Sequence, residues 1–440
     1  MPHRSNVNGT PQPFNALRPQ KLGLPSACAF AQNGRVKPRL VVFAALLLAL
    51  PRAPGADWPQ WRGLARNGLC SERINAAWPA HGPAIRWRAA IGAGFCSISV
   101  SQGRAYTLGN THDQDTIWCF DALTGNVLWK QTYPAPLDPQ WYEGGPGATP
   151  TVDSNRVFTI SKWGDVFCLD AAKGTVLWQR DLRAQGLVPN RWGFAGSPLV
   201  HGDLLILNAG RAGIALHRAT GRVAWSTGTN ATGYASPTLF NPAGRESVLI
   251  FAAKALVALD PATGREFWRH PWETKWDTNI TDPLVAQNRI FISSFSRGCA
   301  LLSVHDDRPE VLYDTKALYN HLSPGVVLGP YLYAFSGEAK FTTDFRCLEL
   351  ASGKLKWTSK DPAFGSVIGV GGQLLVLSDN GQLLLAGASP AGFKPLARAR
   401  VLDGKCWTPP ALANGLLYAR NAKGDLVCVD LSQTAKGGLK

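Results

Sequence analysis

A nine-residue pattern that recurs five times constrains the fold of this chain more than any other feature. Each copy has glycine four positions after its first residue and tryptophan eight positions after it, and the copies are 121–129, 170–178, 217–225, 260–268 and 349–357. Glycine adopts positive φ without a steric penalty, and Asp and Thr side chains bond to turn amides. Each copy therefore predicts a strand, a tight turn and a second strand. The tryptophan is a large apolar plate that we expect to pack against the next unit.

A second pair of short apolar strands precedes each of these hairpins, for example at 197–200 and 204–208. The unit is therefore four short strands in about 45 residues, which is the period of a propeller blade. We assign the following residues to the structural repeat: Asp121, Gly125, Trp129, Asp170, Gly174, Trp178, Gly221, Trp225, Asp260, Gly264, Trp268, Gly353 and Trp357.

The number of units predicts the number of blades. Five regular blades end at the repeat tryptophans, a degenerate blade ends at Tyr313, and another runs over 365–399. The last blade begins near Cys406 and ends at Asp430 without an outer strand, whereas residues 84–87 have the pattern of an outer strand with no blade before them. We expect this N-terminal strand to complete the last blade, because ring closure removes exposed sheet edges. The predicted fold is all-β, a single β-propeller of four-stranded antiparallel blades, with eight blades and seven as the alternative.

The N-terminal region has the pattern of a targeting segment. Residues 40–50 are apolar and follow three basic residues, and the run is shorter than the roughly 18 residues of a membrane span. We expect a cleaved secretory signal with a true start near Val36, because Met1 is the only methionine and a long polar stretch follows it. An uncleaved anchor is the alternative. No cysteine follows the apolar run closely, so we do not expect a lipid-anchored form. The predicted divisions are 1–56 (targeting), 57–83 (extension), 84–431 (propeller) and 432–440 (tail).

The formal charge of +15 is shared between the targeting segment and a basic propeller. Such a balance favours anionic partners or a basic soluble surface. The chain has no Lys/Arg run and no nucleic-acid motif, so we do not expect nucleic-acid binding.

The hairpin pattern D-x-x-T-G-x-x-x-W resembles the PQQ-like β-propeller repeat over residues 84–431. The opening Asp57-Trp-Pro-Gln-Trp-Arg-Gly63 is also similar to the opening of many exported bacterial members of that family. The family includes quinoprotein dehydrogenases, which bind pyrroloquinoline quinone and calcium, and the non-enzymatic BamB-type propeller of outer-membrane protein assembly. The resemblance implies the fold and leaves the function open.

Catalytic signals are absent from the sequence. It has no Cys-Cys dipeptide, no C-x-x-C-H haem site, and no G-x-S-x-G, H-E-x-x-H or P-loop motif. The calcium carboxylate and the catalytic aspartate that the resemblance implies for dehydrogenases match no position here. We therefore expect a non-catalytic protein without a cofactor or metal, and a quinone enzyme with calcium is the alternative.

The cysteines and two histidines have structural interpretations. Four cysteines, Cys119, Cys168, Cys347 and Cys428, lie two residues before the start of a repeat hairpin or its equivalent, where a buried thiol fits as a small apolar group. Cys96 and Cys406 lie before the innermost strands of the first and last blades, so a disulfide between them is an open alternative. His217 and His305 occupy the turn position of Asp and are read as structural.

One constellation points to binding. The loops that lead into the innermost strands, here called the leading loops, share a face of a propeller with the loops between second and third strands. The candidate ligand face comprises Trp141, Tyr142, Trp192, Phe194, Trp276, His321 and Trp407 with Phe95, Tyr234 and Phe364 from the leading loops, and Lys162, Arg211, Lys254, Arg297, Lys340 and Lys423 from the others. An aromatic funnel rimmed by cations suits an anionic ligand or an acidic, aromatic peptide. In the alternative interpretation, the aromatic side chains wedge between blades and the cations are solvated.

These observations favour an exported propeller, periplasmic or secreted, that binds a protein or peptide in the cell envelope. It would resemble BamB in type and act as a monomer or as a subunit of a larger complex. A pyrroloquinoline quinone-dependent dehydrogenase and an envelope glycan-binding module are the alternatives.

Overall fold

The computed structural model describes residues 57–230, 232–338 and 342–432. The predicted targeting segment with its start near Val36, most of the predicted tail, and Lys340 lie outside these residues. Within the described part of the chain, no helix is long and apolar enough to cross a membrane.

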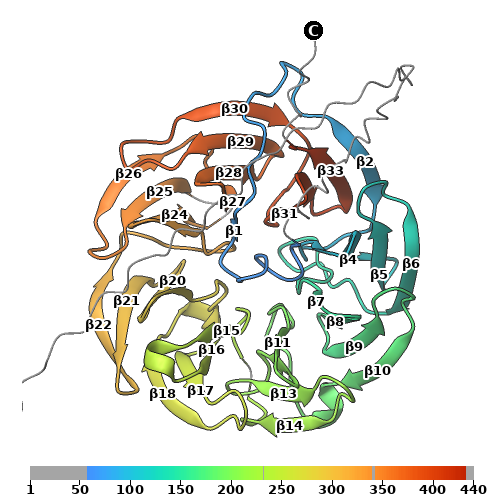
Figure 1. Ribbon diagram of the computed structural model, residues 1–440. Helices are drawn as coiled ribbons and strands as arrows, with labels where there is room; N and C mark the ends of the chain where they lie inside the picture. The colour runs from blue at the N-terminus through green and yellow to red at the C-terminus, as the bar shows by residue number, and fades with distance from the viewer. Residues whose placement is uncertain (1–56, 231, 339–341, 433–440) are drawn as a thin grey trace, which may run out of the picture. The chain divides into compact units, whose positions relative to one another are not determined.

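Eight antiparallel sheets surround a common centre as the blades of a propeller (Figure 1). Blade 1 contains β3 (Ser99–Ser101), β4 (Arg104–Thr111), β5 (Gln114–Asp121) and β6 (Val127–Pro134), and blade 2 contains β7 (Thr151–Asp153), β8 (Arg156–Ile160), β9 (Asp165–Asp170) and β10 (Val176–Asp181). Blade 3 contains β11 (Leu199–His201), β12 (Leu204–Leu207), β13 (Ile214–His217) and β14 (Val223–Ser226), and blade 4 contains β15 (Thr238–Phe240), β16 (Ser247–Phe251), β17 (Ala255–Leu259) and β18 (Glu266–Pro271).

The degenerate repeats form complete blades as well. Blade 5 contains β19 (Leu284–Ala286), β20 (Arg289–Ser294), β21 (Gly298–His305) and β22 (Arg308–Thr315), and blade 6 contains β23 (Val326–Leu328), β24 (Tyr331–Ser336), β25 (Asp344–Glu349) and β26 (Leu355–Ser359). Blade 7 contains β27 (Gly365–Val370), β28 (Gln373–Ser378), β29 (Gln382–Gly387) and β30 (Pro395–Arg400). Short 3-10 helices η1 (Arg183–Gln185), η2 (Pro242–Gly244) and η3 (Lys275–Asp277) lie in connecting segments.

Blade 8 closes the ring with strands from both ends of the described chain. It joins β31 (Ala411–Ala413), β32 (Leu416–Arg420) and β33 (Asp425–Asp430) to β2 (Ile85–Ala90), which runs antiparallel to β33 with Trp87 opposite Cys428. The predicted eight-bladed ring, closed by an N-terminal strand, is therefore confirmed. The structure also contains a strand that the sequence did not predict, β1 (Leu69–Cys70). It pairs in parallel with β27 and so adds a fifth strand at the inner edge of blade 7.

The repeat tryptophans join neighbouring blades. The indole of Trp129 lies on Gly174 of the next blade, where a Cβ atom would come within 2.5 Å of the ring, and its N–H donates to the carbonyl of Ala171 at 3.0 Å. Gly174 has φ of 72°, so the turn conformation and the close contact both require glycine. The same contact joins Trp87 to Gly125, Trp178 to Gly221, Trp225 to Gly264, and Tyr313 to Gly353. The expected packing of each tryptophan against the next blade is confirmed at these junctions.

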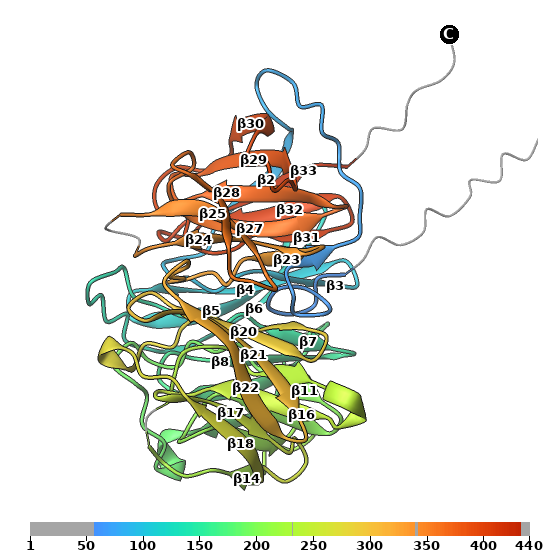
Figure 2. The same cartoon turned by 90° about the vertical axis from the view of Figure 1, so that its left-hand side faces the viewer.

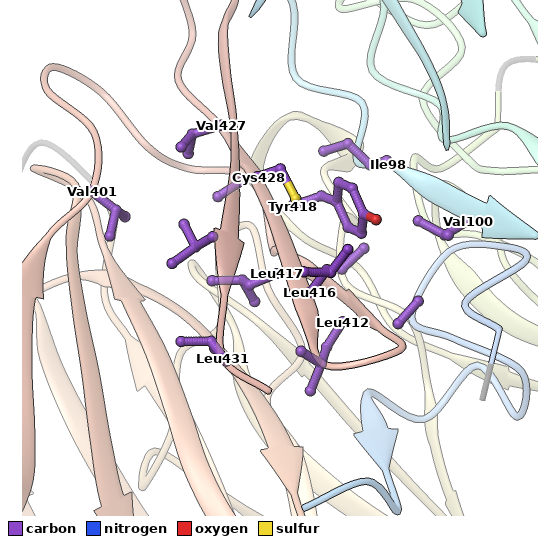
Figure 3. Packing of buried hydrophobic residues seen from close by; sticks show 14 of the residues in the cluster. Ile98, Val100, Val401, Leu412, Leu416, Leu417, Tyr418, Val427, Cys428 and Leu431 are labelled. Carbon is purple, nitrogen blue, oxygen red and sulfur yellow. The ribbon is translucent and has the colours of Figure 1, made fainter. Parts of the chain in front are cut away.

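The seam between blades 8 and 1 is packed like the other junctions. Figure 3 shows Tyr418 of β32 between Cys428 and the Ile98–Val100 segment of blade 1. The Tyr418 hydroxyl donates to the carbonyl of Ala122 at 2.9 Å, so a hydrogen bond crosses the seam.

The described cysteines are all buried and free. The four repeat cysteines therefore occupy buried positions as expected. The alternative of a disulfide between Cys96 and Cys406 is wrong, because the two thiols pack into different core clusters. The Cys96 sulfur instead lies 3.4 Å from Nη1 of the buried Arg420.

A candidate ligand-binding cavity

A cavity of about 730 Å³ lies among the leading loops, and its wall is rich in aromatic side chains. Nine of the ten aromatic or imidazole residues of the predicted face line it, namely Phe95, Trp141, Tyr142, Trp192, Phe194, Tyr234, Trp276, His321 and Trp407. Phe364 lies behind the wall, edge-on to Trp407 with 6.4 Å between ring centroids. The cavity volume is within the range of small-molecule and peptide side-chain sites.

Contacts between rings hold the wall in place. Phe95 lies 5.4 Å from Tyr142 and 5.9 Å from Trp407, measured between centroids. Trp192 and Tyr234 are 5.8 Å apart, and the Tyr234 hydroxyl accepts a hydrogen bond from the backbone N–H of Trp192 at 3.3 Å. Such offset and edge-to-face pairs each add stability, so the wall is preorganised.

Not every aromatic side chain of the predicted face is available to a ligand. Phe194 is buried and packs with Leu182 and Leu187, which matches the alternative in which aromatic residues wedge between blades. Burial lowers the pKa of His321 to about 4, so its imidazole is neutral at pH 7. Phe194 and His321 therefore define the shape of the cavity and offer little side-chain surface or charge to a ligand.

Two tryptophans at the cavity differ from the rest in their exposure. Trp141 is 72% exposed and Trp276 is 58% exposed. Their φ angles are 67° and 70°, in the left-handed region that bulky side chains rarely adopt. Conformations of this kind are concentrated at functional sites, where the surrounding structure maintains them.

The predicted cations are not gathered around the cavity. Lys162 lines it, but this side chain is buried and forms a salt bridge of 2.7 Å with Asp138, whose pKa is lowered mainly by that hydrogen bond. The cavity wall does not include Arg211, Lys254, Arg297 or Lys423. Arg211 pairs with Glu266 at 3.6 Å, and Arg297 pairs with Asp314 and stacks 4.3 Å from Trp272. Glu266 and Asp314 lie on the outer strands β18 and β22, so these two guanidinium groups are drawn away from the axis of the ring.

Two other cations belong to the wall, and both come from the leading loops. The guanidinium carbon of Arg191 lies 5.3 Å from the Trp192 ring and 5.8 Å from the Trp276 ring. The ammonium nitrogen of Lys275 lies 5.1 Å from the Trp276 ring. Neither cation was predicted from the sequence, although the dipeptides Arg191-Trp192 and Lys275-Trp276 place a basic residue directly before a tryptophan of the predicted face.

The N-terminal segment forms the floor of the cavity. The Trp61 indole N–H donates to a carboxylate oxygen of Asp282 at 2.5 Å, and both residues line the cavity. Arg62 lies behind this floor and donates to the carbonyl of Gly325 at 2.8 Å. Burial lowers the pKa of Arg62 to about 10, opposed by the negative charge of Asp282, so it stays protonated at pH 7. The segment appears in blue at the centre of the ring in Figure 1, and beside β3 in Figure 2.

A belt of hydrogen bonds between blades surrounds this floor. The backbone N–H of Ser97 donates to the Thr149 hydroxyl, Thr149 N–H to Ser197, Ser197 N–H to Ser236, and Ser236 N–H to Asp282, over 2.7 to 3.1 Å. Each acceptor in the belt precedes a proline in its leading loop, and Ser323 and Thr408 share that pattern. Asp282 is the one acidic member of the series, a sequence signal that would have pointed to the floor.

The cavity wall does not match the calcium site that the resemblance to quinoproteins implies. Calcium takes six to eight oxygen ligands, several from carboxylates. Among the described residues, no group of three or more His, Cys, Asp and Glu side chains could hold a metal ion. The two carboxylates of the wall are Asp282, whose oxygens already accept hydrogen bonds, and Glu338.

Comparison with known proteins decides the family. The family described as outer membrane protein assembly factor BamB matches residues 113–359, more than half of the chain. The chain belongs to this BamB-like family. None of the curated proteins gives a match.

Solved structures show the same fold in relatives with different activities. BamB from Moraxella catarrhalis is 16% identical with a TM-score of 0.60, covering 79% of this chain and 99% of that chain. Quinohemoprotein alcohol dehydrogenase from Pseudomonas putida is 12% identical with a TM-score of 0.62, covering 88% and 81%. The enzyme from Comamonas testosteroni is 14% identical with a TM-score of 0.60, covering 87% and 82%. At these identities the likeness establishes the propeller alone, so function has to be argued from the site.

Proposed function

We propose that this BamB-like chain is a non-catalytic β-propeller that binds a peptide segment of a partner protein in its central cavity. The observation that carries the proposal is the cavity itself, whose floor is formed by Trp61 and whose wall is aromatic. Trp, Tyr and Arg dominate the buried centres of protein interfaces. The wall contains these three residue types.

The shape of the site favours an extended ligand. Trp141 and Trp276 are exposed while they line the cavity, so apolar contact surface continues outward from it. A peptide could place one or two side chains inside and lay its neighbouring residues against these two rings. A ligand small enough to fit wholly inside would leave the exposed tryptophan surface uncovered.

A pyrroloquinoline quinone-dependent dehydrogenase is the second candidate, because solved enzymes of that type share the fold. A flat quinone could stack on the aromatic side chains of the wall, but the described residues offer no cluster of three or more acidic, His or Cys side chains to hold its calcium ion. We therefore propose that the protein needs no cofactor.

The proposed location is the cell envelope, after export. It is supported by the basic and apolar stretch over 35–50, and by the description of the family as an outer-membrane assembly factor. We propose a monomer or a subunit of an envelope complex, with a protein partner and no nucleic acid.

Photo-crosslinking in the native envelope tests the function. A benzophenone amino acid at Trp141, 72% exposed at the cavity, should capture a protein partner, whereas the same group at Leu355, 42% exposed on the outer strand β26, should not. Capture from both positions would place the partner elsewhere on the ring. Dye reduction with alcohols or sugars after addition of the quinone and calcium would overturn the non-catalytic proposal, and capture of glycans on an array without a protein partner would favour the lectin alternative.

A further inference from the structure

The charges of the cavity wall are unevenly paired. Lys162 is neutralised by Asp138, and Asp282 at the floor accepts hydrogen bonds from Trp61 and Ser236. Arg191 and Lys275 are exposed and form no salt bridge with any described residue. Glu338, the other carboxylate of the wall, also forms no salt bridge with a described residue. The two cations outnumber it, so net positive charge remains in the wall.

Both cations are held against the same ring. Arg191 lies 5.8 Å from the centroid of the Trp276 ring and Lys275 lies 5.1 Å from it. A cation over an indole face is attracted by the ring quadrupole, which keeps its charge close to the apolar surface. The two side chains come from the leading loops of blades 3 and 5, so the fold brings together charges that are 84 positions apart in sequence.

The loops that carry these cations are anchored. The side-chain amide of Asn190 donates to the carbonyl of Thr232 at 2.8 Å, and the N–H of Arg191 donates to the side-chain oxygen of Asn190 at 2.7 Å. The backbone N–H of Lys275 donates to the Ser296 hydroxyl at 3.2 Å. The cations therefore project from fixed backbone positions, which lowers the entropy lost on binding.

We infer that Arg191 and Lys275 form a carboxylate-binding subsite beside Trp276, and that the peptide recognised by the cavity carries an acidic group next to an aromatic side chain. This inference rests on the proposed peptide-binding function and names its substrate class. The aromatic group would enter the cavity against Trp192 and Tyr234, while the carboxylate would pair with the two cations. Asp282 does not repel such a ligand strongly, because the protonated Arg62 lies behind it.

Binding of short blocked peptides to the purified protein tests the subsite. Three peptides carry two phenylalanines around a central Glu, Gln or Lys, and a fourth ends in phenylalanine with a free chain-terminal carboxylate. At low salt we expect the Glu peptide to bind about tenfold more tightly than the Gln peptide, with the advantage shrinking as salt rises. If the fourth peptide binds more tightly than the Glu peptide, the ligand carboxylate is that of a chain terminus. If the Glu peptide binds more tightly, the ligand carboxylate is that of a side chain.

Charge-altered variants connect the preference to the two residues. Lys275→Met should weaken binding of the Glu peptide about fivefold and leave the Gln peptide unchanged. Arg191→Glu should invert the preference, so that the Lys peptide binds best. Arg211→Met is the matched control, because Arg211 is an exposed cation outside the cavity wall, and it should change nothing. Melting curves identify variants that fail to fold. If Arg191→Glu does not fold, Lys275→Glu takes its place as the charge-reversal variant.

The outcomes separate the two claims. Equal binding of the Glu and Gln peptides, unaffected by Arg191→Glu, would overturn the carboxylate subsite and leave peptide binding intact. Absence of binding by all four peptides would overturn the proposed peptide function and the subsite with it.

Discussion

Two sets of tryptophans in this propeller have the same side chain and different surroundings. The set between blades, typified by Trp178, is buried and covers a glycine of the next blade. The second set, Trp141 and Trp276 at the cavity, is exposed and held in a left-handed backbone conformation. The first set gains its energy from packing within the chain, whereas the second leaves apolar surface for another molecule. Stability and binding should therefore depend on different tryptophans.

The largest expected effect comes from removing the N-terminal strand. Deletion of residues 57–90 removes β2 and leaves the edge of β33 unpaired. It also removes the Trp87 ring from Gly125 in the hairpin of blade 1, so the seam between blades 8 and 1 loses its packing. We expect loss of cooperative thermal unfolding, measured by circular dichroism. Deletion of 57–83 is the matched control, since it removes the cavity floor and retains β2. If the shorter and longer deletions melt alike, closure by β2 is not what stabilises the ring.

The next effect tests the set between blades directly. Trp178→Ala should lower the free energy of unfolding by about 3–5 kcal/mol, the usual range for truncation of a buried aromatic residue. It also removes the indole hydrogen bond of 2.9 Å to the carbonyl of Arg218. Denaturant unfolding measures the change, and binding of the partner per folded molecule should stay constant. A loss of less than about 1 kcal/mol would contradict the role assigned to this contact.

The contrast between the two sets also explains what could be predicted from sequence. Each hairpin needs a glycine at a position of positive φ and a tryptophan four positions after it. Both requirements are local in sequence, so the spacing of these residues predicts the blades. The aromatic wall was also predictable, because topology alone places the leading loops on one face. The positions of the cations were not predictable, because the sequence does not show that Arg211 and Arg297 pair with carboxylates of the outer strands. The floor was missed because the bond from Trp61 to Asp282 joins residues 221 positions apart.

A buried carboxyl group provides a pH test inside a blade. Burial raises the pKa of Asp115 to about 6, although hydrogen bonds from Asn110 and Tyr133 oppose this shift. The folded state then holds the proton more tightly than the unfolded state, so stability from this group is present below pH 3.8 and is lost as pH rises through about 6. Asp115→Asn should therefore stabilise the protein by about 2 kcal/mol at pH 7 and have little effect near pH 4.

Unfolding of Asp115→Asn and the parent across this pH range measures the difference. Binding at the cavity should not follow the same profile, because Asp115 does not line it. A variant that is less stable than the parent at pH 7 would show that the charged carboxylate is needed where it lies.

The smallest expected effect on stability is the sharpest test of the comparison. Trp276→Gly removes a side chain that is 58% exposed and places glycine at a φ of 70°, a conformation that glycine adopts readily. The lost contacts and the relieved backbone strain should nearly cancel, so the free energy of unfolding should change by less than about 1 kcal/mol. Binding of the cross-linked partner should instead weaken by about tenfold or more, the effect of losing an interface hot spot. Natural proteins retain strained residues where function needs them and stability does not, so a variant as stable as its parent and deficient in binding would identify Trp276 as such a residue. Were Trp276→Gly to unfold the ring as Trp178→Ala does, the two sets of tryptophans would share one structural role, and the cavity would lose its claim to be a binding site.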